Sequence, residues 1–121
     1  MSPENSRIKD SLRDHLVEND IDFSEHDSFD GVLDQCDICY MTRIQRERFD
    51  SDDAYERARG KVRLDTASVS TMKDSAIILH PLPRLDEIEQ DVDLLPQAYY
   101  FKQAENGMYV RMALLQALVK D

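Results

Sequence analysis

The sequence predicts an α/β fold in which a parallel sheet is flanked by helices. Two apolar runs of strand type, Ile38–Met41 and Ala76–Leu79, alternate with segments of helical periodicity. This alternation is typical of parallel strands joined by right-handed crossovers. The unbroken apolar character of Ala76–Leu79 favours a central position in the sheet. At 121 residues the chain is long enough for one hydrophobic core, so we expect a single domain.

Helices are predicted from apolar spacing and capping residues. A helix capped by Ser2 should end near Asn19, because apolar residues recur at every fourth position, at Ile8, Leu12 and Leu16. Later helices are expected from Asp27 or Ser28 to Leu33, Ser51 to Gly60, Thr66 to Lys73, and Gln103 or Asn106 to Val119.

Weaker strand patterns occur at Ile21–Glu25, Val62–Leu64 and Ala98–Phe101, and Asp86–Val92 should form a helical turn or an irregular loop. A complete α/β unit should open on a strand, whereas this chain opens on a predicted helix. We therefore expect the first strand of the domain to lie upstream of Met1.

The formal charge of −10 is unevenly distributed. Residues 1–37 carry eleven acidic and three basic residues, a balance of −8, whereas residues 41–48 carry three arginines and one glutamate. The positive segment suits small anionic ligands, and the overall charge disfavours nucleic acid and anionic membranes. The acidic amino terminus is unlike a signal peptide, and no apolar run approaches the roughly 18 residues of a membrane span, so we expect a cytoplasmic protein.

Chemically suggestive residues follow the two strongest strand candidates. Arg43 offers a guanidinium that can pair with a carboxylate through two parallel bonds, and the Gln45 amide can both donate and accept. Pro81 and Pro83 stiffen the backbone after the second strand, which fixes the directions of nearby carbonyl groups. Taken alone, Arg43 is most simply a surface arginine and the prolines a stiff turn.

Three stretches taken together are more informative than any single residue: Asp37–Phe49, His80–Ile88 and Ala98–Leu115. Their order and spacing resemble the carboxy-terminal part of aspartate carbamoyltransferase. The resemblance implies most of the second domain of an aspartate/ornithine carbamoyltransferase. The family's carbamoyl-phosphate signature, Ser-Thr-Arg-Thr, does not occur in these residues. We therefore expect residues 1–121 to be an aspartate-binding domain without the carbamoyl-phosphate domain.

The resemblance assigns substrate-binding roles to four residues. Arg43 is implied to bind a substrate carboxylate, and Gln45 to orient the amine. The carbonyls of Pro81 and Leu82 are implied to accept bonds from the carbamoyl NH2, with a cis peptide bond before Pro83. The related ornithine enzymes carry cysteine where this chain has Pro81, so proline favours aspartate as the acceptor.

Other residues are implied in loop closure or structural pairing: Arg48, Tyr55, Arg84, Asp86, Asp93 and Arg111. Arg48 matches an arginine that pairs with the other domain, so it should be an unpaired surface group here. Tyr55 is matched with Asp86, and Asp93 with Arg111.

The family reaction joins L-aspartate and carbamoyl phosphate to give N-carbamoyl-L-aspartate and phosphate, in pyrimidine biosynthesis. It implies a trimeric full protein and needs no cofactor or metal. The family's catalytic histidine lies in the other domain, so no catalytic residue is expected here, and His80 should be a packing or hydrogen-bonding residue. The chain alone should be inactive.

Cys36 and Cys39 have the spacing of redox or zinc motifs, but no second Cys/His pair completes a zinc site. If Asp37 and Ile38 are in a strand, the two thiols point to opposite faces, so we expect buried thiols without metal or disulfide. Two alternatives to an enzyme domain remain: a non-catalytic amino-acid-binding or interaction module, and a remnant whose fold survives only by pairing with another chain.

Overall fold

The fold centres on two short parallel strands. The computed structural model describes residues 7–59 and 62–119. Among these residues, β1 (Ile38–Tyr40) pairs in parallel with β2 (Ile77–Leu79), with Cys39 opposite Ile78. On its other side β2 makes a further parallel bridge, from Ile78 to Ala98. The prediction of a parallel sheet flanked by helices is confirmed, and β2 holds the central place.

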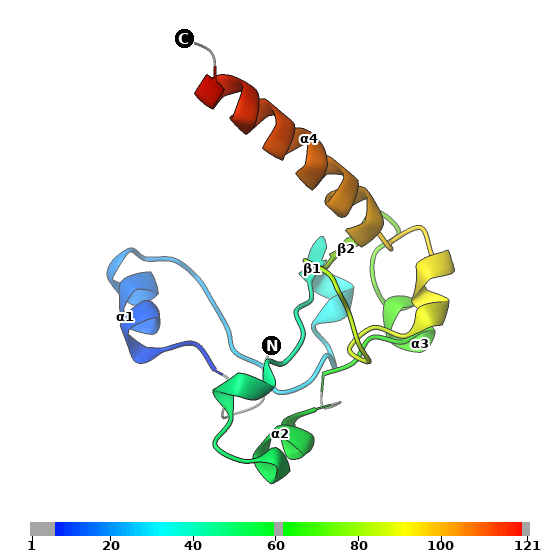
Figure 1. Ribbon diagram of the computed structural model, residues 1–121. Helices are drawn as coiled ribbons and strands as arrows, with labels where there is room; N and C mark the ends of the chain where they lie inside the picture. The colour runs from blue at the N-terminus through cyan, green and yellow to red at the C-terminus, as the bar shows by residue number, and fades with distance from the viewer. Residues whose placement is uncertain (1–6, 60–61, 120–121) are drawn as a thin grey trace.

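Along the chain, helices precede β1, lie between β1 and β2, and follow β2 (Figure 1). The α-helices are α1 (Asp10–Glu18), α2 (Asp52–Ala58), α3 (Thr66–Val69) and α4 (Tyr100–Val119). Short 3-10 turns are η2 (Leu33–Gln35), η3 (Arg46–Arg48) and η4 (Gln90–Leu94). Side-chain caps begin two of these helices, because Ser51 accepts the Ala54 N–H at 3.2 Å and Asp65 accepts the Ser68 N–H at 2.7 Å.

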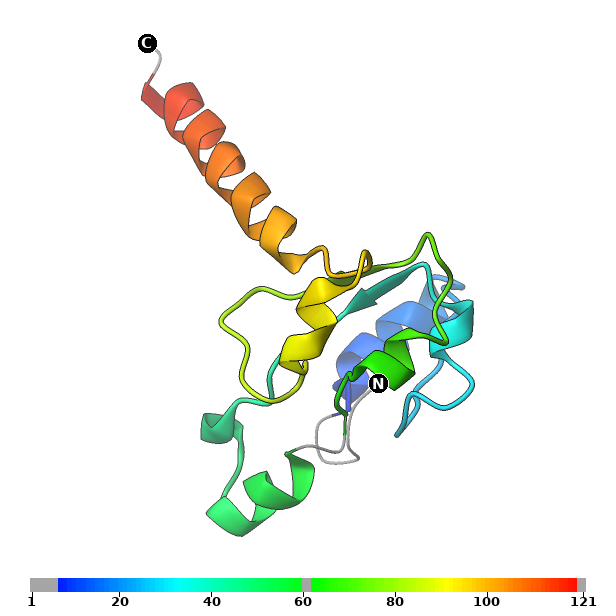
Figure 2. The ribbon, with the colours of Figure 1, turned by 90° about the vertical axis from the view of Figure 1, so that its right-hand side faces the viewer.

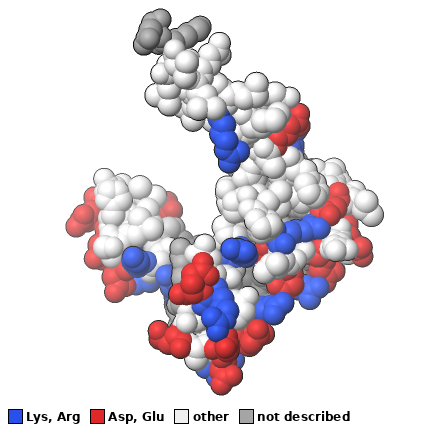
Figure 3. Space-filling view, viewed as in Figure 1, with Lys and Arg blue, Asp and Glu red and all other residues white. Residues whose placement is uncertain are grey.

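The outline of the molecule is open. The long helix α4 projects away from the remaining elements in both views (Figures 1 and 2), and α1 stands to one side in Figure 1. The surface of the projecting helix is mostly uncharged, whereas acidic and basic groups gather over the rest of the visible face (Figure 3). No helix in the described ranges combines the length and apolarity that a membrane crossing requires.

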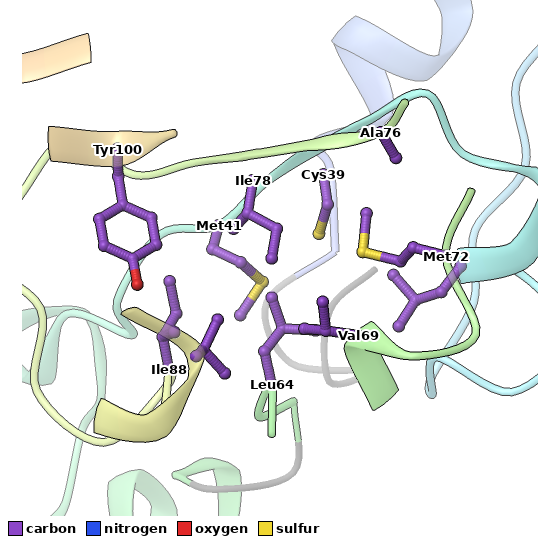
Figure 4. Packing of buried hydrophobic residues seen from close by; sticks show 11 residues of the cluster. Cys39, Met41, Leu64, Val69, Met72, Ala76, Ile78, Ile88 and Tyr100 are labelled. Atoms are coloured by element: carbon purple, nitrogen blue, oxygen red, sulfur yellow. The ribbon is translucent and has the colours of Figure 1, made fainter. Parts of the chain in front are cut away.

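The hydrophobic core lies against one face of the sheet (Figure 4). Ile78 and Leu64 are fully buried there, and Cys39 contributes from β1. The other residues of β1 face outward, since Ile38 is 57% exposed and Tyr40 is 56% exposed. The prediction that 38–41 is a buried strand therefore holds for only one of its faces.

Several predicted elements differ from the structure. Residues 21–25 form no strand, because no described strand lies beside them to receive their backbone hydrogen bonds. The expected helix ending at Leu33 is reduced to turns and η2, since Gly31 adopts a left-handed φ of 65° that interrupts helical geometry. Helix α3 ends early, where Ser70 and Thr71 hydroxyls bond to helix carbonyls.

The remaining differences concern element boundaries. The strand expected at 62–64 is limited to a single bridge between Leu64 and Ile88, and that at 98–101 to the bridge at Ala98. Helix α4 begins at Tyr100, earlier than expected, because this side chain is buried in the core and fixes the first turn there. At the amino terminus α1 begins at Asp10, and the predicted cap at Ser2 lies outside the described residues.

Because the core lies on one face of the sheet, we expect substitutions on that face to lower the free energy of unfolding more than substitutions on the other face. Ile78→Ala should lower the free energy of unfolding by about 2–4 kcal/mol, because it leaves a cavity at a fully buried position. Ile38→Ala, on the neighbouring strand but 57% exposed, should cost less than about 1 kcal/mol. Urea unfolding followed by circular dichroism measures both, and equal losses would contradict the assignment of the core to one face.

Candidate functional site

The candidate site lies where two chain segments leave the same edge of the sheet. Tyr40 is paired with Leu79 at the carboxy ends of the strands, and the Met41 N–H donates to the Leu79 carbonyl at 2.8 Å. The segments that follow, 41–45 and 80–84, therefore start from adjacent positions. This edge of a parallel sheet is the usual place for ligands in α/β folds.

The residues predicted to bind substrate lie on these two segments. Arg43 and Pro81 are exposed, and Gln45 and Leu82 are half-buried. That their polar groups converge on one ligand stays a prediction, but the strand register places the starting points of both segments together.

The second segment has an unusual backbone. Leu82 adopts a left-handed φ of 52°, which costs an L-residue roughly 1–2 kcal/mol. The Leu82–Pro83 peptide bond is cis, as the resemblance implied. A non-glycine residue held in this region points to a site where the surrounding structure imposes the conformation.

His80 holds this segment from inside. Its side chain is 1% exposed, and its Nδ1 accepts the Leu82 N–H at 2.8 Å. Its Nε2 lies 2.7 Å from Oε1 of Glu87. Because both ring nitrogens are engaged, His80 is a hydrogen-bonding residue rather than a free base, as the sequence suggested.

Gln103 ties helix α4 to both strands at this edge. Its Oε1 accepts the His80 N–H at 2.9 Å, and its Nε2 donates to the Tyr40 hydroxyl at 3.1 Å. The sequence analysis assigned no site role to Gln103. The indication that it offered was the place of Gln103 within a stretch that resembles the family, because its partners His80 and Tyr40 are brought beside it by the strand register.

A second polar cluster lies beside the site and is structural. Arg84 Nη2 donates to Asp93 Oδ2 at 2.6 Å, and the Tyr100 hydroxyl also donates to this carboxylate. The Arg84 guanidinium further lies 5.6 Å from the centre of the Tyr100 ring. Hydrogen bonding from Arg84 lowers the pKa of Asp93, and burial, assisted by Asp93, raises the pKa of Tyr100 to about 12.

Two expected pairings differ from those observed. Asp93 pairs with Arg84 instead of Arg111, because Arg111 lies on the exposed surface of projecting helix α4. Asp86 accepts a bond from Arg59 at 2.8 Å, whereas Tyr55 packs edge-on against Phe49 with ring centres 5.8 Å apart.

The side chain of Arg48, which is predicted to be unpaired, lies outside the described part of the structure.

The cysteines are free thiols. Cys39 is buried in β1, and burial raises its pKa to about 11. Cys36 lies just before the strand, after η2, so the expected strand between the two thiols is shorter than predicted. In the described part of the chain, no group of three or more His, Cys, Asp or Glu side chains is arranged to hold a metal ion.

The arrangement is suited to holding a small ligand that carries both an anionic group and N–H donors. Arg43 supplies positive charge at the exposed edge, and the stiffened 80–84 segment supplies backbone carbonyls. Such groups position a ligand through directed hydrogen bonds and charge, which are the means of catalysis by orientation.

Known proteins are similar to this chain in sequence and in fold. The family model described as "Aspartate/ornithine carbamoyltransferase, Asp/Orn binding domain" matches residues 1–118. A chloroplastic aspartate carbamoyltransferase of Arabidopsis thaliana is 48% identical over 98% of this chain, and a catalytic subunit from Halorubrum lacusprofundi is 43% identical over 100% of this chain. The chain spans only 31% and 39% of these two relatives.

Solved structures agree. The catalytic subunit of M. jannaschii aspartate transcarbamoylase superposes with a TM-score of 0.84 at 43% identity, over 97% of this chain and 38% of that one. The Trypanosoma cruzi aspartate transcarbamoylase in complex with carbamoyl phosphate and aspartate gives a TM-score of 0.83 at 33% identity, over 95% and 39%.

The cluster beside the site predicts a dependence of stability on pH. Asp93 has a lower pKa in the folded chain than its unfolded value of about 3.9, so its stabilisation is complete above that value and is lost as pH falls through the lower native pKa. Asp93→Asn should therefore lower the free energy of unfolding at pH 7 by about 2 kcal/mol and remove this acid-side loss.

Asp37→Asn is the matched control, because Asp37 pairs with Lys73 while 79% exposed. It should change stability by less than about 1 kcal/mol. Urea unfolding between pH 7 and pH 2.5 measures both variants. An Asp93→Asn variant with the stability and pH profile of the control would contradict the structural role of the cluster.

Proposed function

Because the chain belongs to the aspartate/ornithine carbamoyltransferase family and matches its Asp/Orn-binding domain, we propose that it is the aspartate-binding part of an aspartate carbamoyltransferase. The reaction joins L-aspartate and carbamoyl phosphate to give N-carbamoyl-L-aspartate and phosphate, a step of pyrimidine biosynthesis. The observation that carries this proposal is the common edge from which the Arg43 and Pro81 segments leave the sheet.

The choice of substrates has independent support. The names of the curated relatives are those of aspartate carbamoyltransferases, and one solved relative holds aspartate and carbamoyl phosphate together. Pro81 stands where the ornithine enzymes of the family carry cysteine, which favours aspartate as the acceptor.

The proposed chemistry is geometric and electrostatic. Arg43 pairs with a carboxylate of aspartate, and Gln45 orients the α-amine that attacks the carbamoyl carbon. The carbonyls of Pro81 and Leu82 accept bonds from the carbamoyl NH2 and fix the plane of the group under attack. Bringing the two reactants together in this way replaces a bimolecular encounter by a step within one complex.

This chain supplies only part of such a site. Groups that bind phosphate and stabilise the developing oxyanion provide most of the transition-state stabilisation in acyl-type transfer. The family takes these groups from an amino-terminal carbamoyl-phosphate domain, which we propose as the partner, in the same polypeptide or as a separate chain. The resemblance further supports a trimeric full protein. A cytoplasmic location remains a prediction, since some plant relatives are named chloroplastic.

Helix α4 supports the existence of this partner. Over residues 108–119 nearly every side chain is apolar. The large apolar side chains of this stretch are exposed on every side of the helix, with exposed fractions between 49% for Met108 and 82% for Leu118. A helix that is apolar all round is ordinarily buried. The chain spans 31% to 39% of its relatives, so much of the family's polypeptide is available to cover this helix.

The activity itself is testable. The chain alone should form no carbamoyl aspartate and bind aspartate with a Kd of about 1 mM or weaker, because water screens an open half-site. Mixed or co-expressed with a carbamoyl-phosphate domain, it should turn over, and Arg43→Ala should then lower kcat/KM for aspartate by about 100-fold. A colorimetric assay of carbamoyl aspartate measures this.

Arg63→Ala is the matched control, because Arg63 is half-exposed, pairs with Glu89 at 2.9 Å and lies outside the segments 41–45 and 80–84. It should retain full activity in the mixture. Aspartate binding without turnover in any mixture would favour the non-catalytic binding module, and turnover by the chain alone would contradict the proposed division of the site.

The partner surface gives a separate prediction. Met112→Ser combined with Leu115→Ser should weaken association with the carbamoyl-phosphate domain by at least about tenfold, because both side chains are more than half exposed here and would lose apolar burial. The stability of the isolated chain should change little. Calorimetric titration measures the association, and unchanged affinity would show that α4 is not part of the interface.

A further inference from the structure

We propose that His80 and Glu87 form a positioning pair that fixes the carbonyl directions of Pro81 and Leu82 toward the carbamoyl group. This inference rests on the proposed function for its substrate, but its structural part stands on this chain alone. Neither residue contacts the substrate. Both act on the backbone of the loop that joins them, residues 81–86.

The ring of His80 has a defined protonation pattern. The Leu82 backbone N–H can only donate, so Nδ1, 2.8 Å away, is an acceptor and carries no proton. The proton of the neutral ring is then on Nε2, which donates to Glu87 at 2.7 Å. The ring thus joins a backbone amide on one side to a carboxylate on the other, at a position that is 1% exposed.

The bond to Leu82 sets the backbone of the proposed carbamoyl contact. Leu82 has a φ of 52°, a conformation that side-chain-bearing residues seldom adopt without external support. The His80 ring supplies that support by closing a turn onto the Leu82 N–H. The peptide planes on both sides of this residue, and with them the Pro81 and Leu82 carbonyls, depend on this turn.

Glu87 secures the far end of the same loop. Its carboxylate is buried at 8% exposure and accepts the Leu85 N–H at 3.1 and 3.2 Å, in addition to the His80 ring. A buried carboxylate requires its donors, because an unpaired charge in this position is costly. Loop and carboxylate therefore stabilise each other, with Pro83 held between two anchored amides.

The pair is also fixed relative to the other half of the site. Gln103 accepts the His80 N–H at 2.9 Å and donates to the Tyr40 hydroxyl at 3.1 Å. Tyr40 ends β1, three residues before Arg43. The carbonyl-bearing loop and the strand that leads to the carboxylate-binding arginine are thus connected through one amide side chain.

Two substitutions at His80 separate positioning from general stability. In His80→Asn the amide oxygen can replace Nδ1 as acceptor of the Leu82 N–H, but the bond to Glu87 is lost. In His80→Gln the amide nitrogen can replace Nε2 as donor to Glu87, but the Leu82 N–H loses its acceptor. Each variant removes one of the two ring contacts, and Glu89→Gln, at the exposed pair with Arg63, is the surface control.

The structural readout uses the isolated chain. Hydrogen exchange of the Leu82 amide, followed by NMR, should stay slow in wild type, His80→Asn and Glu89→Gln, and become at least about tenfold faster in His80→Gln. Long-range proton–nitrogen correlation in wild type should show Nε2 protonated and Nδ1 unprotonated. Equal exchange in both His80 variants, or the opposite tautomer, would overturn the inference.

The functional readout uses the chain assembled with the carbamoyl-phosphate domain. His80→Gln should lower kcat/KM for carbamoyl phosphate by about 10- to 100-fold, because misplaced carbonyls spoil the orientation of the reacting group, whereas His80→Asn should lose less than about fivefold. The KM for aspartate should change little in either variant. Losses that are equal, or that simply follow the unfolding free energies, would show a merely structural role.

These measurements also separate this inference from the proposed function. An assembly of wild-type chain that makes no carbamoyl aspartate refutes the proposed function. The exchange experiment then decides the inference by itself: selective opening of Leu82 in His80→Gln supports the positioning of the loop, and equal opening overturns it.

Discussion

The parallel pairing of β1 with β2 is the constraint on which the rest of the structure depends. Its register sets Tyr40 opposite Leu79, so the arginine-bearing segment and the proline-bearing segment leave from neighbouring points. A shift of one residue would turn Cys39 and Ile78 out of the core and move both segments relative to each other. Core packing and site geometry are therefore specified by the same few hydrogen bonds.

Around this edge, hydrogen bonds between polar side chains connect segments that further strands would connect in a larger sheet. Gln103 links β1, β2 and the first turn of α4, while Arg84, Asp93 and Tyr100 join the loop after β2 to η4 and α4. Such links need complete satisfaction, because a buried polar group without a partner costs roughly 1–3 kcal/mol. This requirement explains why both ring nitrogens of His80 and both carboxylate oxygens of Glu87 have hydrogen-bond partners.

The sequence predicted what depends on pattern and composition. The α/β class, both strands, a helix beginning near Ser51 and the long last helix follow from apolar periodicity, and the cis bond before Pro83 follows from the family resemblance. It did not predict which charges pair. Asp93 lies nine residues after Arg84 and eighteen residues before Arg111, and it pairs with Arg84 because Arg111 lies on the projecting helix α4. Likewise, strand patterns such as 21–25 become strands only when a neighbouring edge is present, which local sequence does not encode.

The exposure of α1 and α4 bears both on the stability of the fold and on the exposure of the candidate site to water. Among the described residues, α1 has no buried side chain and α4 buries only Tyr100, so both helices gain little of the tertiary packing from which helices in proteins draw most of their stability. The base of α4, at Gln103, lies beside a site whose Arg43 and Pro81 are exposed to water. A partner that covered α4 would bury apolar area and, through Gln103 at the base of the helix, bear on the loop that carries the carbonyl groups. Coverage of α4 and exclusion of water from the site would then be a single event, and the proposed pairing of Arg43 with a substrate carboxylate would be strengthened by it, since a charge pair weakens in proportion to the local dielectric constant.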